Sequence, residues 1–273
     1  MTDASLTASM MRRMWHRGRR GASTGAIYIA SVIAMLILWE WAARFFNIEL
    51  LFPGPSLVAE RGEDLLADHT LISASVYSLV RILAGFILGG SLGAFIGLLM
   101  GSSPTVNTFF GTYVDFFRFI PVFAWFGPIV LWVGANEYSL VVLIAYATFF
   151  VVVINTLAGV TQIPQNSVRV TKMYGATRRQ TFLSVTLPGT MSYIFTGLRL
   201  GIGSSFMTVV AAEFLQANNG LGFLLSVFQT YYDMPGIFSA IICLGILGFA
   251  WDRLYVMLVN RFGSHYLPGG HLV

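Results

Sequence analysis

PQNSVRVTKMYGATRRQTFLSVTLPG, residues 164–189, lies between two strongly apolar segments and is the longest run outside the N-terminus that is too polar to sit in lipid. It contains four cations and no carboxylate: Arg169, Lys172, Arg178 and Arg179. The function of this polar stretch therefore bears on the function of the whole chain.

Helix breakers divide the stretch into two arms. Pro164 opens it, Gly175 interrupts it, and Pro188 is expected to close it. Thr177 and Gln180 have the spacing of a capping box, which predicts that a new helix begins after Gly175. We expect a polar helix, a glycine turn and a second short helix, held at a membrane surface.

The composition is that of an integral membrane protein. Hydrophobic residues make up 56% of the chain and charged residues only 10%, whereas soluble domains carry about 25% charged residues. The net charge is +4. The cations flank the membrane segments, which favours membrane orientation over nucleic-acid binding as the reason for the positive charge. The single cysteine, Cys243, excludes an internal disulfide and a cysteine metal site.

Six segments are each close to the roughly 20 apolar residues that a bilayer core requires. They cover about residues 25–43, 73–100, 110–133, 139–161, 190–214 and 237–259. The first is too long for a signal peptide, so residues 1–24 are predicted to be a basic cytoplasmic tail and residues 25–273 a single transmembrane domain. Between the first two spans, residues 56–69 are predicted to form an amphipathic surface helix.

The distribution of cations predicts the orientation. With the N-terminus inside, eleven Lys and Arg residues lie in cytoplasmic segments and two, Arg44 and Arg61, lie outside. The cytoplasmic set is Arg12, Arg13, Arg17, Arg19, Arg20, Arg169, Lys172, Arg178, Arg179, Arg253 and Arg261. This positive-inside bias predicts that both termini and the 164–188 loop are cytoplasmic.

Charge within a span is costly and is either paired or functional, and four charged residues in the spans are candidates for a functional role. They are Arg81, Arg118, Arg199 and Glu213. Arg118 follows Asp115 by three residues, which predicts an intrahelical pair, whereas Arg81 has no local partner. Two interpretations stay open for these four: interhelical pairing, or contact with an anionic solute or a gate.

Two further segments allow alternatives. Glycines recur at every fourth residue from Gly85 to Gly101, which favours close helix packing over lining of a pathway. Residues 216–236 form either a partly embedded outer helix or an interfacial loop.

The chain lacks the motifs of catalysis. It has no GxxxxGK[ST] phosphate loop, because its only lysine, Lys172, follows Thr171. No Ser-His-Asp or HExxH pattern is present, and the four histidines are scattered over the loops. We therefore expect no enzyme activity, cofactor or metal in this chain.

The polar stretch resembles the cytoplasmic loop of binding-protein-dependent ABC transporter permeases. That loop reads Glu-Ala-Ala, three residues, Gly, nine residues, Ile-x-Leu-Pro. Here Gly175 is followed by nine residues and then by Val-Thr-Leu-Pro at 185–188, while Arg-Val-Thr at 169–171 departs from Glu-Ala-Ala. Residues 51–58, 75–101, 115–137 and 196–222 also resemble segments of the nitrate/sulfonate/taurine-type subfamily.

The resemblance implies an all-α, six-helix type I importer permease in the bacterial inner membrane. Its implied partners are a second permease copy, two ATPase subunits that bind ATP and Mg, an extracytoplasmic solute-binding protein and membrane lipid. The implied solute is a small anionic or heteroaromatic compound. The implied ATPase-coupling residues are Arg169, Val170, Thr171, Lys172, Gly175, Ala176, Thr177, Leu187 and Pro188.

Other classes of protein remain as rivals. A secondary transporter or channel would work without an ATPase but leaves the polar loop unexplained. An export permease would not need a binding protein, and a membrane-embedded enzyme lacks a catalytic constellation.

Overall fold

The computed structural model describes residues 27–46 and 51–267. Predictions about the basic tail at 1–24 and about the last six residues lie outside the described residues. Every element within the described ranges is a helix.

Five helices are long and apolar enough to cross a membrane. They are Ile27–Phe46, α3 (Thr70–Ser102), α6 (Glu137–Thr161), α9 (Leu187–Gln216) and α11 (Met234–Phe262). A bent helix pair makes a sixth if the pair is counted as one span. The prediction of an all-α membrane protein is therefore confirmed, with five or six candidate spans.

The third span is not the single helix predicted for residues 110–133. It consists of α4 (Pro104–Phe117), the short 3-10 helix η1 (Val122–Trp125) and α5 (Phe126–Val133), with a bend of 95°. Pro121 has no backbone N–H to donate and sits at ψ 138° before η1, so the helix stops and restarts there. We call residues 118–126 the elbow.

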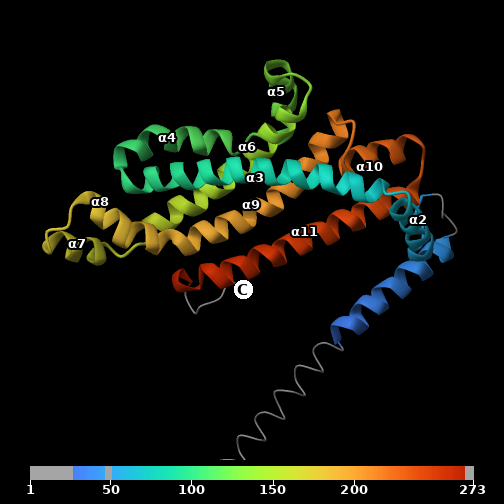
Figure 1. Ribbon diagram of the computed structural model, residues 1–273, viewed down its shortest axis with the longest axis horizontal. Coiled ribbons are helices and arrows are strands. Elements are labelled where there is room, and N and C mark those ends of the chain that lie inside the picture. Colours follow the sequence, from blue (N-terminus) through green and yellow to red (C-terminus); the bar gives the residue numbers. More distant parts are fainter. Residues whose placement is uncertain (1–26, 47–50, 268–273) are drawn as a thin grey trace, which may run out of the picture.

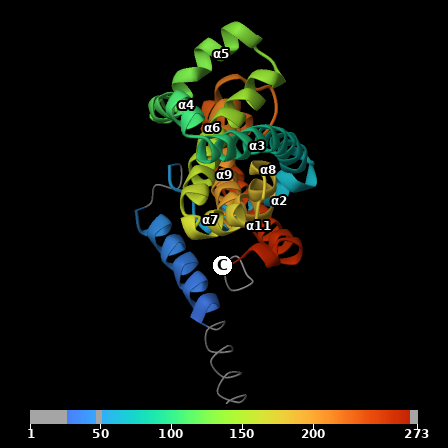
Figure 2. The same ribbon diagram turned by 90° about the vertical axis from the view of Figure 1, so that its left-hand side faces the viewer.

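Helices α3, α6 and α9 form the centre of the bundle and run side by side in both views (Figures 1 and 2). The glycine stripe of α3 faces α6. A β-carbon at Gly93 would lie 2.7 Å from the carbonyl oxygen of Phe149, and one at Gly97 would lie 2.8 Å from that of Val153. The packing interpretation of the stripe is therefore correct.

The helix Ile27–Phe46 stands apart from the bundle over most of its length (Figures 1 and 2). It meets the rest of the chain near its end, where the Trp39 ring lies 5.6 Å from that of Phe238. The predicted surface helix is α2 (Pro55–Ala67), which buries Val58 and Leu65.

The segment between α9 and α11 contains a helix, α10 (Leu221–Thr230). It buries Leu221, Leu224 and Phe228 in a cluster with Leu71 and Ala240. The choice between an outer helix and a loop is thereby decided in favour of the helix.

Candidate functional site

The polar stretch folds as a hairpin at one end of the bundle, far from α10 at the other end (Figure 1). Its first arm is α7 (Gln165–Met173) and its second begins with α8 (Arg178–Thr181). Gly175 makes the turn at φ +78°, a conformation that favours glycine. The predicted capping box is present: Thr177 N–H donates to Gln180 Oε1 at 2.8 Å, and Gln180 N–H donates to Thr177 Oγ1 at 3.3 Å.

The second arm does not end at Pro188 as predicted. It continues through a π-helical turn, Phe182–Thr186, into α9, so that residues 178–216 form one helix of 39 residues. A π turn widens the hydrogen-bond ladder and accommodates a proline that cannot donate to it. The second arm is therefore an extension of α9.

The hairpin presents an exposed basic surface. No residue of α7 is buried, and Met173 and Tyr174 are 85% and 88% exposed. Its four cations form no ion pair with any residue in the described ranges. The predicted coupling residues from 169 to 177 are brought together here, whereas Leu187 and Pro188 lie farther along, at the start of α9.

At the opposite end of α3, Arg81 is the centre of a buried polar network. Its side chain is 3% exposed, and all five of its N–H groups donate. Nε and Nη2 bind the Glu137 carboxylate at 2.5 and 2.6 Å, and Nη1 donates to Glu213 Oε1 and to the Asn219 carbonyl, each at 2.8 Å. The last N–H, on Nη2, donates to Asn219 Oδ1.

Glu213 connects this network to the start of α10. The side chain is fully buried and accepts hydrogen bonds from Ser78 Oγ at 2.8 Å and from Gly222 N–H at 2.9 Å. Ser78 Oγ in turn accepts from Leu221 N–H at 2.9 Å. The first N–H groups of α10, which have no partner within the helix, are satisfied in this way.

The other two predicted arginines are also paired. Arg199 binds Asp252 of α11 through Nε at 2.7 Å and Nη2 at 3.0 Å. Arg118 lies 3.2 Å from Asp115, as its spacing predicted, and its guanidinium sits 4.7 Å from the centre of the Phe119 ring.

Sequence reasoning missed four of these partners: Ser78, Glu137, Asn219 and Asp252. Only Arg81 itself indicated that such partners exist, because a cation inside the membrane that has no partner nearby in the sequence requires a distant one. Its carboxylates are 56 and 132 positions away, so no short-range pattern identifies them.

Five or six apolar spans, a protruding basic hairpin and paired charges inside the bundle are the features of a multi-pass membrane protein. No three His, Cys, Asp or Glu side chains gather to hold a metal within the described ranges.

Residues 89–264 match the family described as "binding-protein-dependent transport system inner membrane component". The chain belongs to this family of importers and is a multi-pass ABC transporter permease.

Several relatives are more than 30% identical to this chain. A probable ABC transporter permease protein of Brucella melitensis is 36% identical over 205 residues, 75% of this chain and 83% of the relative. The taurine transport system permease protein TauC of Escherichia coli is 33% identical over 227 residues, 81% of this chain and 82% of its own. The bicarbonate transport system permease protein CmpB of Synechococcus elongatus is 28% identical, covering 84% and 86% of the two chains.

Solved structures share the fold. A bacterial ABC transporter involved in the import of the acidic polysaccharide alginate aligns over 92% of this chain and 99% of its own, with a TM-score of 0.61 and 15% identity. The inward-facing MetNI methionine ABC transporter aligns over 68% of this chain and 92% of its own, with a TM-score of 0.60 and 16% identity. The predicted type I permease fold is confirmed.

Proposed function

We propose that two copies of this chain form the translocation pathway of an ATP-driven importer in the bacterial inner membrane. Two separate ATPase subunits bind ATP and Mg and act on the hairpin. An extracytoplasmic solute-binding protein delivers a small solute to the opposite face. This chain itself carries no cofactor and catalyses no reaction.

The observation that carries the proposal is the continuity of the hairpin with α9. The second arm and α9 are one helix from residue 178 to residue 216, so a force on the hairpin acts directly on a central span. The first arm leads back into α6 through Pro164. A partner that moves the hairpin would therefore displace α6 and α9 together, as alternating access requires.

The positive-inside count supports a cytoplasmic hairpin and an external Arg81 network. The coupling role falls to Arg169, Val170, Thr171, Lys172, Gly175, Ala176 and Thr177, with Leu187 and Pro188 joining the hairpin to α9. The exposed cations suit a partner with acidic side chains.

Most of the charged residues inside the spans have a structural role in this proposal. We infer that Arg81, Arg199 and Glu213 hold its helices, since each is engaged by other side chains. Arg118, the first residue of the elbow, has a side chain that is 37% exposed and is the candidate for contact at a gate. Relatives named for taurine and bicarbonate support a small solute.

Reconstitution tests this function. Proteoliposomes that contain the chain and its ATPase should accumulate solute in the lumen under two conditions only. ATP must be present in the lumen, on the side of the hairpin, and the binding protein must be present outside. Accumulation driven by an ion gradient without the ATPase would establish a secondary transporter. ATP-driven extrusion without the binding protein would establish an exporter.

A further inference from the structure

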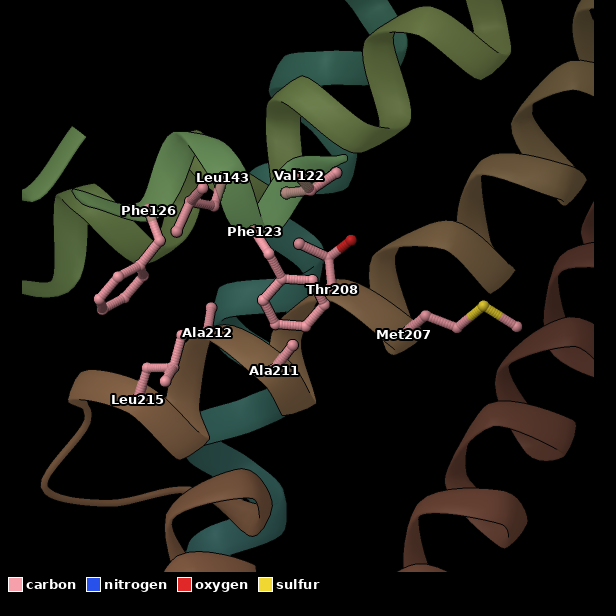
Figure 3. Close-up of a pocket in the computed structure, with 9 residues that line it drawn as sticks. All are labelled: Val122, Phe123, Phe126, Leu143, Met207, Thr208, Ala211, Ala212 and Leu215. Carbon is pink, nitrogen blue, oxygen red and sulfur yellow. The ribbon is translucent and has the colours of Figure 1, made fainter. Parts of the chain in front are cut away.

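A cavity of about 170 Å³ lies between the elbow and α9 (Figure 3). The elbow contributes Val122, Phe123 and Phe126, α6 contributes Leu143, and α9 contributes its last three turns. In Figure 3 the Phe123 ring lies over Ala211 and Thr208, and the Met207 side chain points away from them. Met207 is 80% exposed and marks the open side of the cavity.

The walls of the cavity are apolar and uncharged. Of its nine lining residues only Thr208 has a polar side chain, and that hydroxyl already donates to the Ser204 carbonyl at 2.8 Å. An inorganic anion would leave water here without gaining any cation or free donor, which costs several kcal/mol. The cavity therefore does not suit nitrate or bicarbonate.

The size of the cavity fits a single ring. An apolar protein cavity of about 150 Å³ binds benzene, and the present volume is slightly larger. The phenylalanines at 123 and 126 offer aromatic faces and edges, with which a planar ring packs favourably.

The cavity lies in the half of the bundle predicted to face the solute-binding protein. Leu215 is one residue from the end of α9, and Ala212 adjoins Glu213 of the Arg81 network. Its two phenylalanines belong to the bent third span, so a movement of the elbow would open or close it. A released solute would meet this site early in its passage.

We propose that this cavity is a solute subsite and that it takes the ring of a small organic solute with one six-membered aromatic ring. Any charged group of that solute stays at the open side. The inference rests on the proposed importer function and narrows its solute from small anionic or heteroaromatic compounds to compounds that carry an aromatic ring.

Photolabelling tests the subsite directly. The full-length chain in lipid nanodiscs is irradiated with a trifluoromethyl-diazirinyl benzoate, whose carboxylate keeps it out of the bilayer. Labelled residues are located by mass spectrometry. The label should fall on residues 122–126 and 207–215, and benzoate should reduce it about tenfold, whereas acetate and nitrate should leave it unchanged.

Two matched variants make the result specific. Ala211→Phe fills the cavity and should lower labelling by about tenfold, the scale of a steric change in an apolar pocket. Ala250→Phe makes the same change at an exposed position of α11 and should leave labelling unchanged.

Three results would overturn the subsite. They are labelling that Ala211→Phe does not reduce, labelling spread along all outward-facing helices as expected for lipid contact, and disulfide-linked dimers of Ala211→Cys in a Cys243→Ser background, which would show that a second copy fills the cavity. The assay needs neither ATP nor the ATPase, so ATP-driven uptake with any of these results would refute the subsite and leave the importer function intact.

Discussion

Arg81 is fixed by five hydrogen bonds to two helices, α6 and α9, and to the loop before α10, while its two carboxylate partners differ in exposure. Glu213 is fully buried, whereas the Glu137 side chain is 61% exposed. Removal of one member of a buried ion pair leaves an uncompensated charge and costs about 3–5 kcal/mol. An exposed partner contributes only about 0–1 kcal/mol.

Arg81→Met should therefore lower the thermal midpoint of the purified chain strongly, and Glu137→Gln should lower it little. Arg81→Lys should also lower the thermal midpoint, because an ammonium group has three N–H donors whereas the guanidinium uses five. Size-exclusion chromatography of heated, detergent-solubilised samples gives the three midpoints. Equal losses for Arg81→Met and Glu137→Gln would refute the assignment of Glu213 as the main partner.

Arg199 and Asp252 form the second interhelical pair, between α9 and α11. If the only role of each residue is to pair with the other, the uptake defects of Arg199→Ala and Asp252→Ala should not add. The double variant should then transport no more slowly than the slower of the two single variants. If Arg199 instead binds an anionic solute, Arg199→Ala should raise KM in both backgrounds. Uptake kinetics of the four proteins in proteoliposomes distinguish these outcomes.

At the scale of elements, the hairpin depends on one backbone conformation. Gly175 has φ +78°, and a β-carbon added there would meet no atom within 4 Å, so any cost of a larger residue comes from the backbone and not from a clash. A β-branched residue strongly disfavours this region.

Gly175→Val should uncouple the transporter, with ATP hydrolysis retained and solute uptake reduced severalfold, because the two arms lose their fixed angle. Gly245→Val is the matched control, since Gly245 also has open space around it but no positive φ. Uptake and phosphate release are measured in the same proteoliposomes. Normal coupling in Gly175→Val would show that the hairpin does not act as a lever.

The elements that sequence predicted well are those specified by local chemistry. The capping box at Thr177, the turn at Gly175 and the pair of Asp115 with Arg118 depend on residues three or four positions apart. Pro188 was expected to end a helix, but the preceding π turn absorbs it. Residues 110–133 were predicted as a single helical span, and instead Pro121 permits a 95° bend there.

The partners of the buried charges could not be predicted from short stretches of sequence. Hydropathy places α3, α6 and α9 in the membrane but does not specify which faces meet. Arg81 reaches Glu137 and Glu213 only because the glycine stripe brings α3 against α6 and because α9 packs beside both. Contacts of this kind follow from tertiary packing.

In the whole molecule, the helix from residue 178 to 216 connects the hairpin, the cavity and the Arg81 network. Thirty-nine helical residues extend for about 58 Å, nearly twice the hydrocarbon thickness of about 30 Å. Its first turns form the second arm of the hairpin, its later turns line the cavity, and Glu213 near its end holds α10. A displacement at the hairpin is thereby transmitted to the opposite end of the bundle.

The central claim is that the hairpin is the surface on which the ATPase acts. Met173→Cys, at a position 85% exposed on the hairpin, and Tyr138→Cys, at one 74% exposed at the far end of α6, provide matched probes once the native cysteine is removed by Cys243→Ser. A reagent with a maleimide at one end and a photoreactive benzophenone at the other should, on irradiation, cross-link the assembled ATPase to the cysteine at 173 and not to the one at 138. A cross-link at 138, or none at 173, would contradict the account.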